Sequence, residues 1–301
     1  MISGLSAKNQ EFIDNLDNIQ SQLNTDVLQI SSGSRMNQVS DDPDQVSELL
    51  QARAALSASQ QITTNLGGIS AEVDTGEQTL QTSVQLFDQV QTLAAEGSTG
   101  TQTAATRSTI AQQLQGIEQQ YVALADTSFE GRYIFSGDSD QTEPYTYDAT
   151  QADPVSAYLG TASTRQALNP NGTTFPVALT AQQIFDSADP TTNVFGALNG
   201  LITALQNNDP TAVQTSANGL ATVAQYMNNQ LAFYGTTQDI VASATDYAST
   251  QQTELTSVVS SLSDTDTASA ILNMTQAQTD QQAALGSYAQ MSQKTLFDFL
   301  A

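Results

Sequence analysis

The first 30 residues carry an apolar pattern that restricts this chain more than any other feature. Large apolar residues recur at steps of seven, four, three, four and seven, the rhythm of a helix that packs along one narrow seam. A helix of about 25 residues is roughly 40 Å long, too long for a small globule to cover. The pattern predicts that another long helix packs on residues Leu5, Phe12, Leu16, Ile19, Leu23 and Ile30.

The C-terminal end supplies the natural partner. A last helix is expected after Asp264-Thr265-Asp266, with apolar residues along it up to Leu300. We expect both ends to find their lasting cover in neighbouring subunits, because helices with few contacts are marginal in water. The predicted subunit interface comprises Leu5, Phe12, Leu16, Ile19, Leu23, Ile30, Leu262, Leu272, Leu285, Met291, Leu296, Phe299 and Leu300.

Between the ends, helical periodicity returns in three stretches. They run from Pro43 to about Glu96, from Ile110 to about Ser128, and from Val194 to about Ser260. Local signals support these boundaries. Gly33 suits the stop of the first helix. Asp42-Pro43 and Asp209-Pro210 each place an N-cap residue before a proline at the first helical position.

One stretch lacks the helical period. Residues 129–137 concentrate aromatic and β-branched residues between glycines, which favours a short strand or tight turn. Prolines, glycines and acids then punctuate residues 138–186, and Asn171-Gly172 is typical of a hairpin turn. The prediction is a mainly α chain: an elongated antiparallel helical bundle or coiled coil with paired N- and C-terminal helices and a small β-rich insertion at the far tip.

Three regions follow from this reading. Residues 1–40 with 262–301 form a terminal-helix polymerisation domain, and residues 41–137 with 187–261 form a helical rod. Residues 138–186 form the insertion.

Composition excludes several classes of function. The net charge of −24 leaves no basic patch for nucleic acid or an anionic membrane. There is no Cys and no His, so thiol and histidine chemistry are excluded, and we predict no catalytic site, cofactor or metal. The N-terminus does not resemble a cleavable signal peptide, which alone favours the cytoplasm.

A few acidic segments are candidate binding or catalytic sites. Asp138-Ser139-Asp140 and Asp264-Thr265-Asp266 begin like a calcium loop but lack its later glycine and glutamate. Asn171-Gly172-Thr173 matches a glycosylation sequon, although a hairpin turn needs Asn-Gly for its own reasons. Asp138, Asp140 and Glu143 are the only cluster that a carboxylate-dependent hydrolase could use.

Arginine is scarce, so each one matters. Arg35 lies near Asp41 and Asp42, and Arg132 lies in an aromatic run with Tyr133 and Phe135. Two interpretations stay open: a surface ion pair worth about 0–1 kcal/mol, or a contact that fixes one segment or subunit against another, with Arg132 stacked on a ring.

Ile30-Ser31-Ser32-Gly33-Ser34-Arg35-Met36-Asn37, followed by Asp41-Asp42, resembles the end of the first helix in the bacterial flagellin family. With Gly131-Arg132-Tyr133-Ile134-Phe135-Ser136-Gly137, Asp41-Asp42-Pro43 is similar to the hook–filament junction proteins of that family more than to true flagellins. The closing residues, 284–300, resemble the family's last helix.

The resemblance implies a structural subunit of the flagellum, outside the cell and exported without a cleavable signal. It also implies the partners: the first hook–filament junction protein, flagellin, a ring of identical subunits, and an export chaperone. A filament-forming flagellin is the alternative within the family. Outside it, a hydrolase in the insertion and an extracellular adhesin or coiled-coil stalk remain open.

Overall fold

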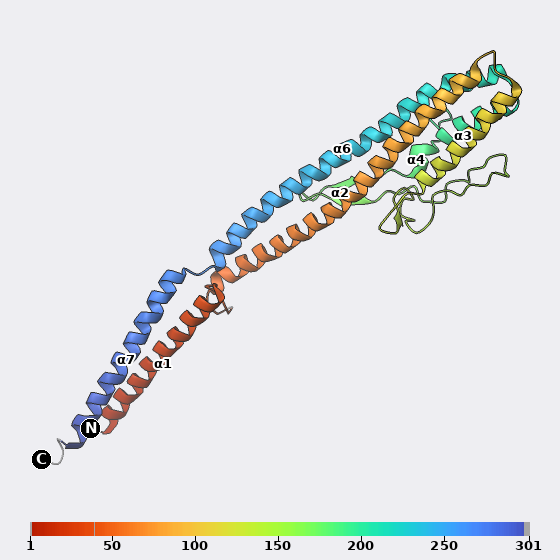
Figure 1. The fold of residues 1–301 in the computed structure, drawn as a ribbon. Coiled ribbons are helices and arrows are strands. Elements are labelled where there is room, and N and C mark those ends of the chain that lie inside the picture. Colours follow the sequence, from red (N-terminus) through yellow and green to blue (C-terminus); the bar gives the residue numbers. More distant parts are fainter. Residues whose placement is uncertain (1, 39, 298–301) are drawn as a thin grey trace. The chain divides into compact units, whose positions relative to one another are not determined.

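The computed structural model describes residues 2–38 and 40–297, and the side chains of residues 9–38 and 40–290. In this range the chain is mainly helical and carries two small antiparallel hairpins (Figure 1). It divides into two compact units, residues 1–58 with 251–301 and residues 59–250. The predicted class, mainly α with paired terminal helices and a small β insertion, is confirmed.

The helices are α1 (Ile2–Ser32), α2 (Pro43–Ser98), α3 (Ala104–Ala125), α4 (Ala181–Phe185), α5 (Val194–Gln206), α6 (Pro210–Ser263) and α7 (Thr267–Phe297). The strands are β1 (Ser128–Phe129), β2 (Arg132–Tyr133), β3 (Gln166–Leu168) and β4 (Thr174–Pro176), and β1 pairs with β2 and β3 with β4.

The helix boundaries follow the local signals. Gly33 takes a φ of +68° and its N–H donates to the Gln29 carbonyl at 2.9 Å, which ends α1. Before α6, Asp209 Oδ1 accepts from the N–H groups of Thr211 and Ala212 at 2.9 and 3.0 Å. Asp266 caps α7 in the same way through Ala268. Acids at these positions satisfy N–H groups that have no partner within the helix.

In the smaller unit, α1 and α7 run antiparallel. Gln281 donates to Gln20 at 3.0 Å, and Tyr288 stacks on Phe12. The earlier residue of α1, Phe12, contacts the later residue of α7, Tyr288, as expected for an antiparallel pair. The pairing of the two chain ends is therefore a real helix–helix contact within one molecule (Figure 1).

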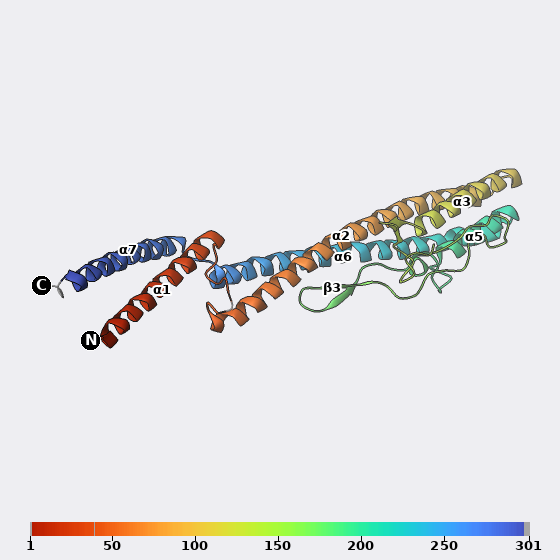
Figure 2. The ribbon, with the colours of Figure 1, turned by 90° about the horizontal axis from the view of Figure 1, so that it is seen from below.

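In the larger unit, α2, α3, α5 and α6 lie alongside one another (Figure 2). Aromatic rings fill the space between them, and Phe195 packs edge-on against Tyr145 with ring centroids 5.1 Å apart. Tyr121 is fully buried and its hydroxyl donates to the Ser83 carbonyl at 2.5 Å. This core is thick enough to support a globular body.

The segment expected at a far tip lies along the helices of this unit. Tyr147 donates to the Gln115 carbonyl of α3 at 3.5 Å, and the Leu179 N–H donates to the Tyr234 hydroxyl of α6 at 3.2 Å. The reason is hydrophobic, because Phe175 and the neighbouring Val177 are buried in the same core as apolar residues of the helices. The turns that join α2 to α3 and α5 to α6 form the end of the unit instead.

Candidate assembly surface

The seam of α1 faces α7 but is covered only in part. Leu23 is buried, whereas Phe12, Leu16, Ile19 and Ile30 are half-buried. The buried residues that α7 contributes are small, Ala270 and Ala277. Two helices with a thin seam between them cannot bury both apolar stripes, so the pair remains rich in accessible apolar surface.

Large apolar side chains stay exposed on both helices of the pair. Leu272 is 71% exposed and Leu285 is 49% exposed, and both belong to the predicted subunit interface. Their exposed neighbours are Ile13, Val27 and Leu28 on α1 and Ile271 and Tyr288 on α7. The exposure of Leu272 and Leu285 leaves these predicted interface residues of α7 accessible to another molecule.

The remaining interface residues are placed as follows. Leu262 is half-buried in the last turn of α6. Leu5, Met291 and Leu296 belong to helices whose side chains are not described at those positions, and Phe299 and Leu300 lie outside the described residues.

The connector between α1 and α2 joins the two chain ends. Ser34 forms an isolated antiparallel bridge with Asp264, and the Arg35 N–H donates to the Ser263 carbonyl at 2.6 Å. In return, the Thr265 N–H donates to the Gly33 carbonyl at 3.0 Å. The connector thereby fixes where α7 starts relative to where α1 ends.

Arg35 strengthens this junction through its guanidinium. It donates to the Leu262 carbonyl at 3.2 Å and to Gln45 at 2.7 Å, and lies 3.7 Å from Asp42. Asp41 accepts from the N–H groups of Asn37 and Gln38 at 2.8 Å each. Arg35 therefore binds a backbone carbonyl of α6, Asp41 binds N–H groups of the connector, and Asp42 pairs with Arg35.

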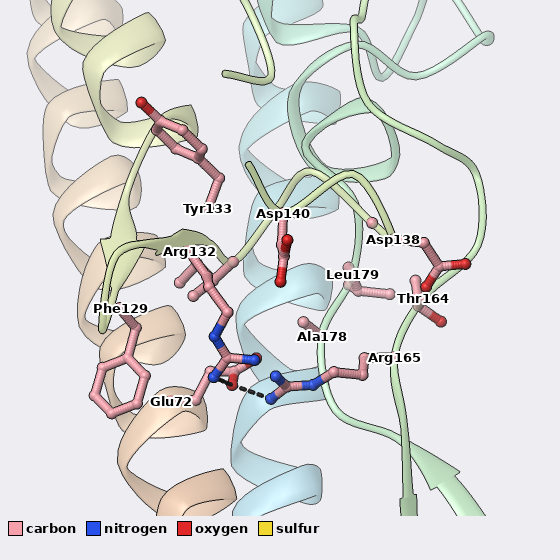
Figure 3. A pocket seen from close by; sticks show the side chains of 12 residues that line it. Glu72, Phe129, Arg132, Tyr133, Asp138, Asp140, Thr164, Arg165, Ala178 and Leu179 are labelled. Atoms are coloured by element: carbon pink, nitrogen blue, oxygen red, sulfur yellow. Dashed lines mark hydrogen bonds and ion pairs between the residues drawn. The ribbon is translucent and has the colours of Figure 1, made fainter. Parts of the chain in front are cut away.

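The second motif lies in the larger unit around a buried acid. Arg132 lies 3.9 Å from the carboxylate of Glu72, and Arg165 also contacts it (Figure 3). Glu72 is buried in α2, while both arginines are partly exposed. Two segments that are far apart in sequence are thus tied to one carboxylate, which would be costly to bury alone.

The other members of this motif have separate roles. Phe135 is fully buried and packs edge-on against Tyr234, with ring centroids 6.4 Å apart. The Tyr133 hydroxyl donates to Glu143 at 3.2 Å. Arg132 makes the ion pair with Glu72, where sequence reasoning also allowed a stack on Tyr133 or Phe135.

Sequence reasoning missed Glu72 and Arg165. A usable signal existed for each: Glu72 interrupts the apolar stripe of its helix beside Val73, and Arg165 is one of only five arginines. The buried Arg107 was missed as well. It donates to the carbonyls of Gly97 and Thr99 at 3.1 and 3.2 Å and so closes the end of α2.

Two carboxyl groups outside the Asp138–Glu143 cluster have strongly raised pKa values, and Glu143 contributes to the shift of one of them, Asp126. Burial raises the pKa of Glu118 to about 7, with a smaller contribution from Asp153. Burial also raises the pKa of Asp126 to about 6. Within the described residues, no group of three or more His, Cys, Asp or Glu side chains is arranged to hold a metal ion.

Over the same part of the chain, every helix lacks an apolar run long enough to cross a bilayer. Several large apolar side chains are exposed on the two helices of the α1–α7 pair, which are otherwise mostly polar.

Comparison with known proteins matches both halves of the chain to one family. The N-terminal helical region of bacterial flagellin matches residues 5–140, and its C-terminal helical region matches residues 202–300. The two matches together cover more than three quarters of the 301 residues. No curated protein matches the chain in sequence.

Solved structures share the fold at low identity. A protein of Vibrio parahaemolyticus assigned as flagellar hook-associated is 19% identical, with a TM-score of 0.65 over 74% of this chain and 100% of its own. FlgL of Xanthomonas campestris is 17% identical, with a TM-score of 0.55 over 68% and 99%. FlgL of Bacillus cereus is 20% identical, with a TM-score of 0.54 over 69% and 96%.

Proposed function

This chain belongs to the bacterial flagellin family, and we propose that it is a structural adaptor at the junction between the flagellar hook and filament. It acts by assembly and carries out no catalysis. The junction motifs Asp41-Asp42-Pro43 and Gly131–Gly137 support this place within the family, as does the likeness in fold to hook-associated proteins.

One observation carries the proposal: the α1–α7 pair leaves several of its large apolar residues exposed, with Leu272 at 71%. In an assembly, neighbouring copies would cover these residues. Each Å² of apolar surface that is removed from water makes the free energy of association more favourable by roughly 25 cal/mol. Folding of the ends and polymerisation then use the same helical surface.

The regions predicted from the sequence would divide this work. The polymerisation domain is formed by residues 1–40 with 262–301. The helical rod is formed by residues 41–137 with 187–261, and the insertion by residues 138–186. The breaks between α1 and α2 and between α6 and α7 lie near these boundaries, whereas the compact units divide at residues 58/59 and 250/251.

The partners follow from the proposed place. Identical copies form a ring, the first junction protein lies on its hook side, and flagellin lies on its filament side. Before export without a cleavable signal, a chaperone covers the exposed apolar residues of α7. No nucleic acid or membrane partner is proposed, because of the net charge of −24.

Deletion of the gene in the source cells tests the place in the flagellum. We expect cells that keep their hooks but release flagellin into the medium, and a plasmid copy should restore filaments. Normal filaments in the deletion strain would count against the proposal.

A second experiment separates the adaptor from a filament-forming flagellin. Purified full-length chain should stay a limited assembly under conditions in which flagellin polymerises. Long filaments of this chain alone would favour flagellin.

A further inference from the structure

A cleft in the larger unit has no role in the function proposed above. It has a volume of about 490 Å³ and lies between α2, the β1–β2 hairpin and β3. Ile62, Leu66 and Phe129 give it an apolar floor, and Leu168 at its rim is 51% exposed. A hollow with exposed apolar residues and a polar edge is suited to a protein partner.

Two arginines stand at the edge of this cleft. The side chains of Arg132 and Arg165 are 36% and 38% exposed, and both point towards Glu72 (Figure 3). The structure describes all of residues 59–250, whose third basic residue, Arg107, is buried. The cleft is thus the place on this unit where a partner can reach positive charge.

The rest of the unit is acidic. Residues 59–250 hold 18 acids against 3 arginines, a net charge of −15. Copies of such a body repel each other, and contact is least costly where an arginine meets an acid. Glu72 and Glu130 balance the two arginines, so the cleft lining itself is neutral.

A matching acidic surface occurs on α6. Asp239 and Asp246 are exposed and lie seven residues apart, which places them on one face of the helix. The buried residues Val241, Ala244 and Ala248 occupy the opposite face. Beside the acids, Tyr247 is an exposed aromatic residue. We call Asp239, Asp246 and Tyr247 the α6 stripe.

The stripe and the cleft lie at the same level along the α2–α6 pair. Ser59 Oγ donates to the Ala248 carbonyl at 3.3 Å, and Gln238 Nε2 donates to Asp74 at 2.9 Å. These two contacts bracket residues 62–72 of the cleft and residues 239–247 of the stripe. A neighbour at the same height can therefore present one surface to the other.

We propose that the cleft of one copy receives the α6 stripe of a second copy, with Asp239 and Asp246 at Arg132 and Arg165. Tyr247 then covers Leu168 at the rim. Since two different surfaces meet, the contact is head-to-tail and closes into a ring or continues as a helix. The inference rests on the proposed function, because it names the lateral contact of that assembly.

Cross-linking in flagella isolated from the source cells tests this contact. The chain has no Cys, so Leu168→Cys on one copy and Tyr247→Cys on a co-expressed copy are the only cysteines through which two copies of it can be joined. We expect a disulfide-linked dimer. Leu159→Cys, at an equally exposed site of the same unit, is the matched control and should cross-link with Tyr247→Cys at least tenfold less.

Charge exchange then tests the ion pairs. Asp239→Lys with Asp246→Lys, added to the Tyr247→Cys copy, should lower the dimer yield at least tenfold. Adding Arg132→Glu to the Leu168→Cys copy should restore it. Thermal melting of each variant confirms that it folds, and the stripe variants change only an exposed face.

Three results would overturn the contact. They are equal cross-linking from Leu159→Cys, an unchanged dimer yield when Asp239 and Asp246 are replaced by Lys, or a yield that does not recover when Arg132→Glu is added. In each of these the chain is still found in the flagella, so the adaptor proposal stands. Absence of the chain from isolated flagella would instead refute the adaptor proposal, and the contact with it.

Discussion

The ring of Phe12 in α1 stacks on the ring of Tyr288 in α7, with centroids 4.4 Å apart and planes inclined by 14°. These residues lie at opposite ends of the sequence, so the stack pins the two chain ends to one another. Within the described residues it is the aromatic contact between α1 and α7, and few other large side chains are buried between them.

Replacing Phe12 by Ala should therefore loosen the pair. Loss of the stack removes about 1 kcal/mol beyond the apolar area it buries, and amide hydrogen exchange in residues 9–30 should accelerate accordingly. Ile13→Ala is the matched control, because Ile13 is 48% exposed and should leave exchange in the monomer unchanged. Equal acceleration in both variants would contradict the role of the stack.

Limited proteolysis of dilute, purified chain should remove the ends first. Few buried apolar contacts allow α1 and α7 to open locally, whereas the aromatic core of residues 59–250 resists. Mass spectrometry is expected to show loss of roughly residues 1–40 and 262–301. In assembled flagella the same segments should be protected, and ends that resist equally in the monomer would argue against completion by neighbours.

Stability should fall as the pH rises from about 4.5 to about 7. Glu118 is buried and neither of its carboxylate oxygens has a hydrogen-bond partner, so its pKa rises from 4.5 to about 7 in the folded chain. Below this range the group is neutral in both states. Above it the folded state carries the cost of a buried charge, about 1–2 kcal/mol after allowance for solvent screening.

Glu118→Gln should remove part of this pH dependence and raise the free energy of unfolding above pH 7, as measured by urea titration at several pH values. Asp126, whose pKa is also raised, contributes in the same direction and leaves the remaining slope. Glu96→Gln, at an exposed position of α2, should keep the full dependence of the unchanged chain. An unaltered slope in Glu118→Gln would disprove the assignment.

Gly76→Ala should destabilise the larger unit. A methyl group at Gly76 would meet the ring of the fully buried Tyr234, and overpacking a rigid core costs about 1–3 kcal/mol. Gly116→Ala serves as control, because nothing lies within 4 Å of its added Cβ in α3. In Gly116→Ala the gain in helix propensity should raise the free energy of unfolding by about 0.5–1 kcal/mol. Thermal melting with opposite shifts for the two variants would support both.

Much of the helical framework was predictable because its signals are local. Gly33, Asp42-Pro43 and Asp209-Pro210 mark helix ends through the conformations they allow and the N–H groups they satisfy. The Asn171-Gly172 turn between β3 and β4 is another such case, with Gly172 at a φ of +87°.

The sequence by itself determined that the ends are long helices with thin apolar seams. Apolar residues that recur at spacings of three, four and seven fall on one face of a helix. Only the tertiary structure decided that Glu72 meets Arg132 and Arg165, and that residues 138–186 lie along the helices. Those contacts join segments up to 93 residues apart. A single sequence leaves such pairings open, since many acids and several folds of an irregular segment satisfy the same local rules until a shared core selects one.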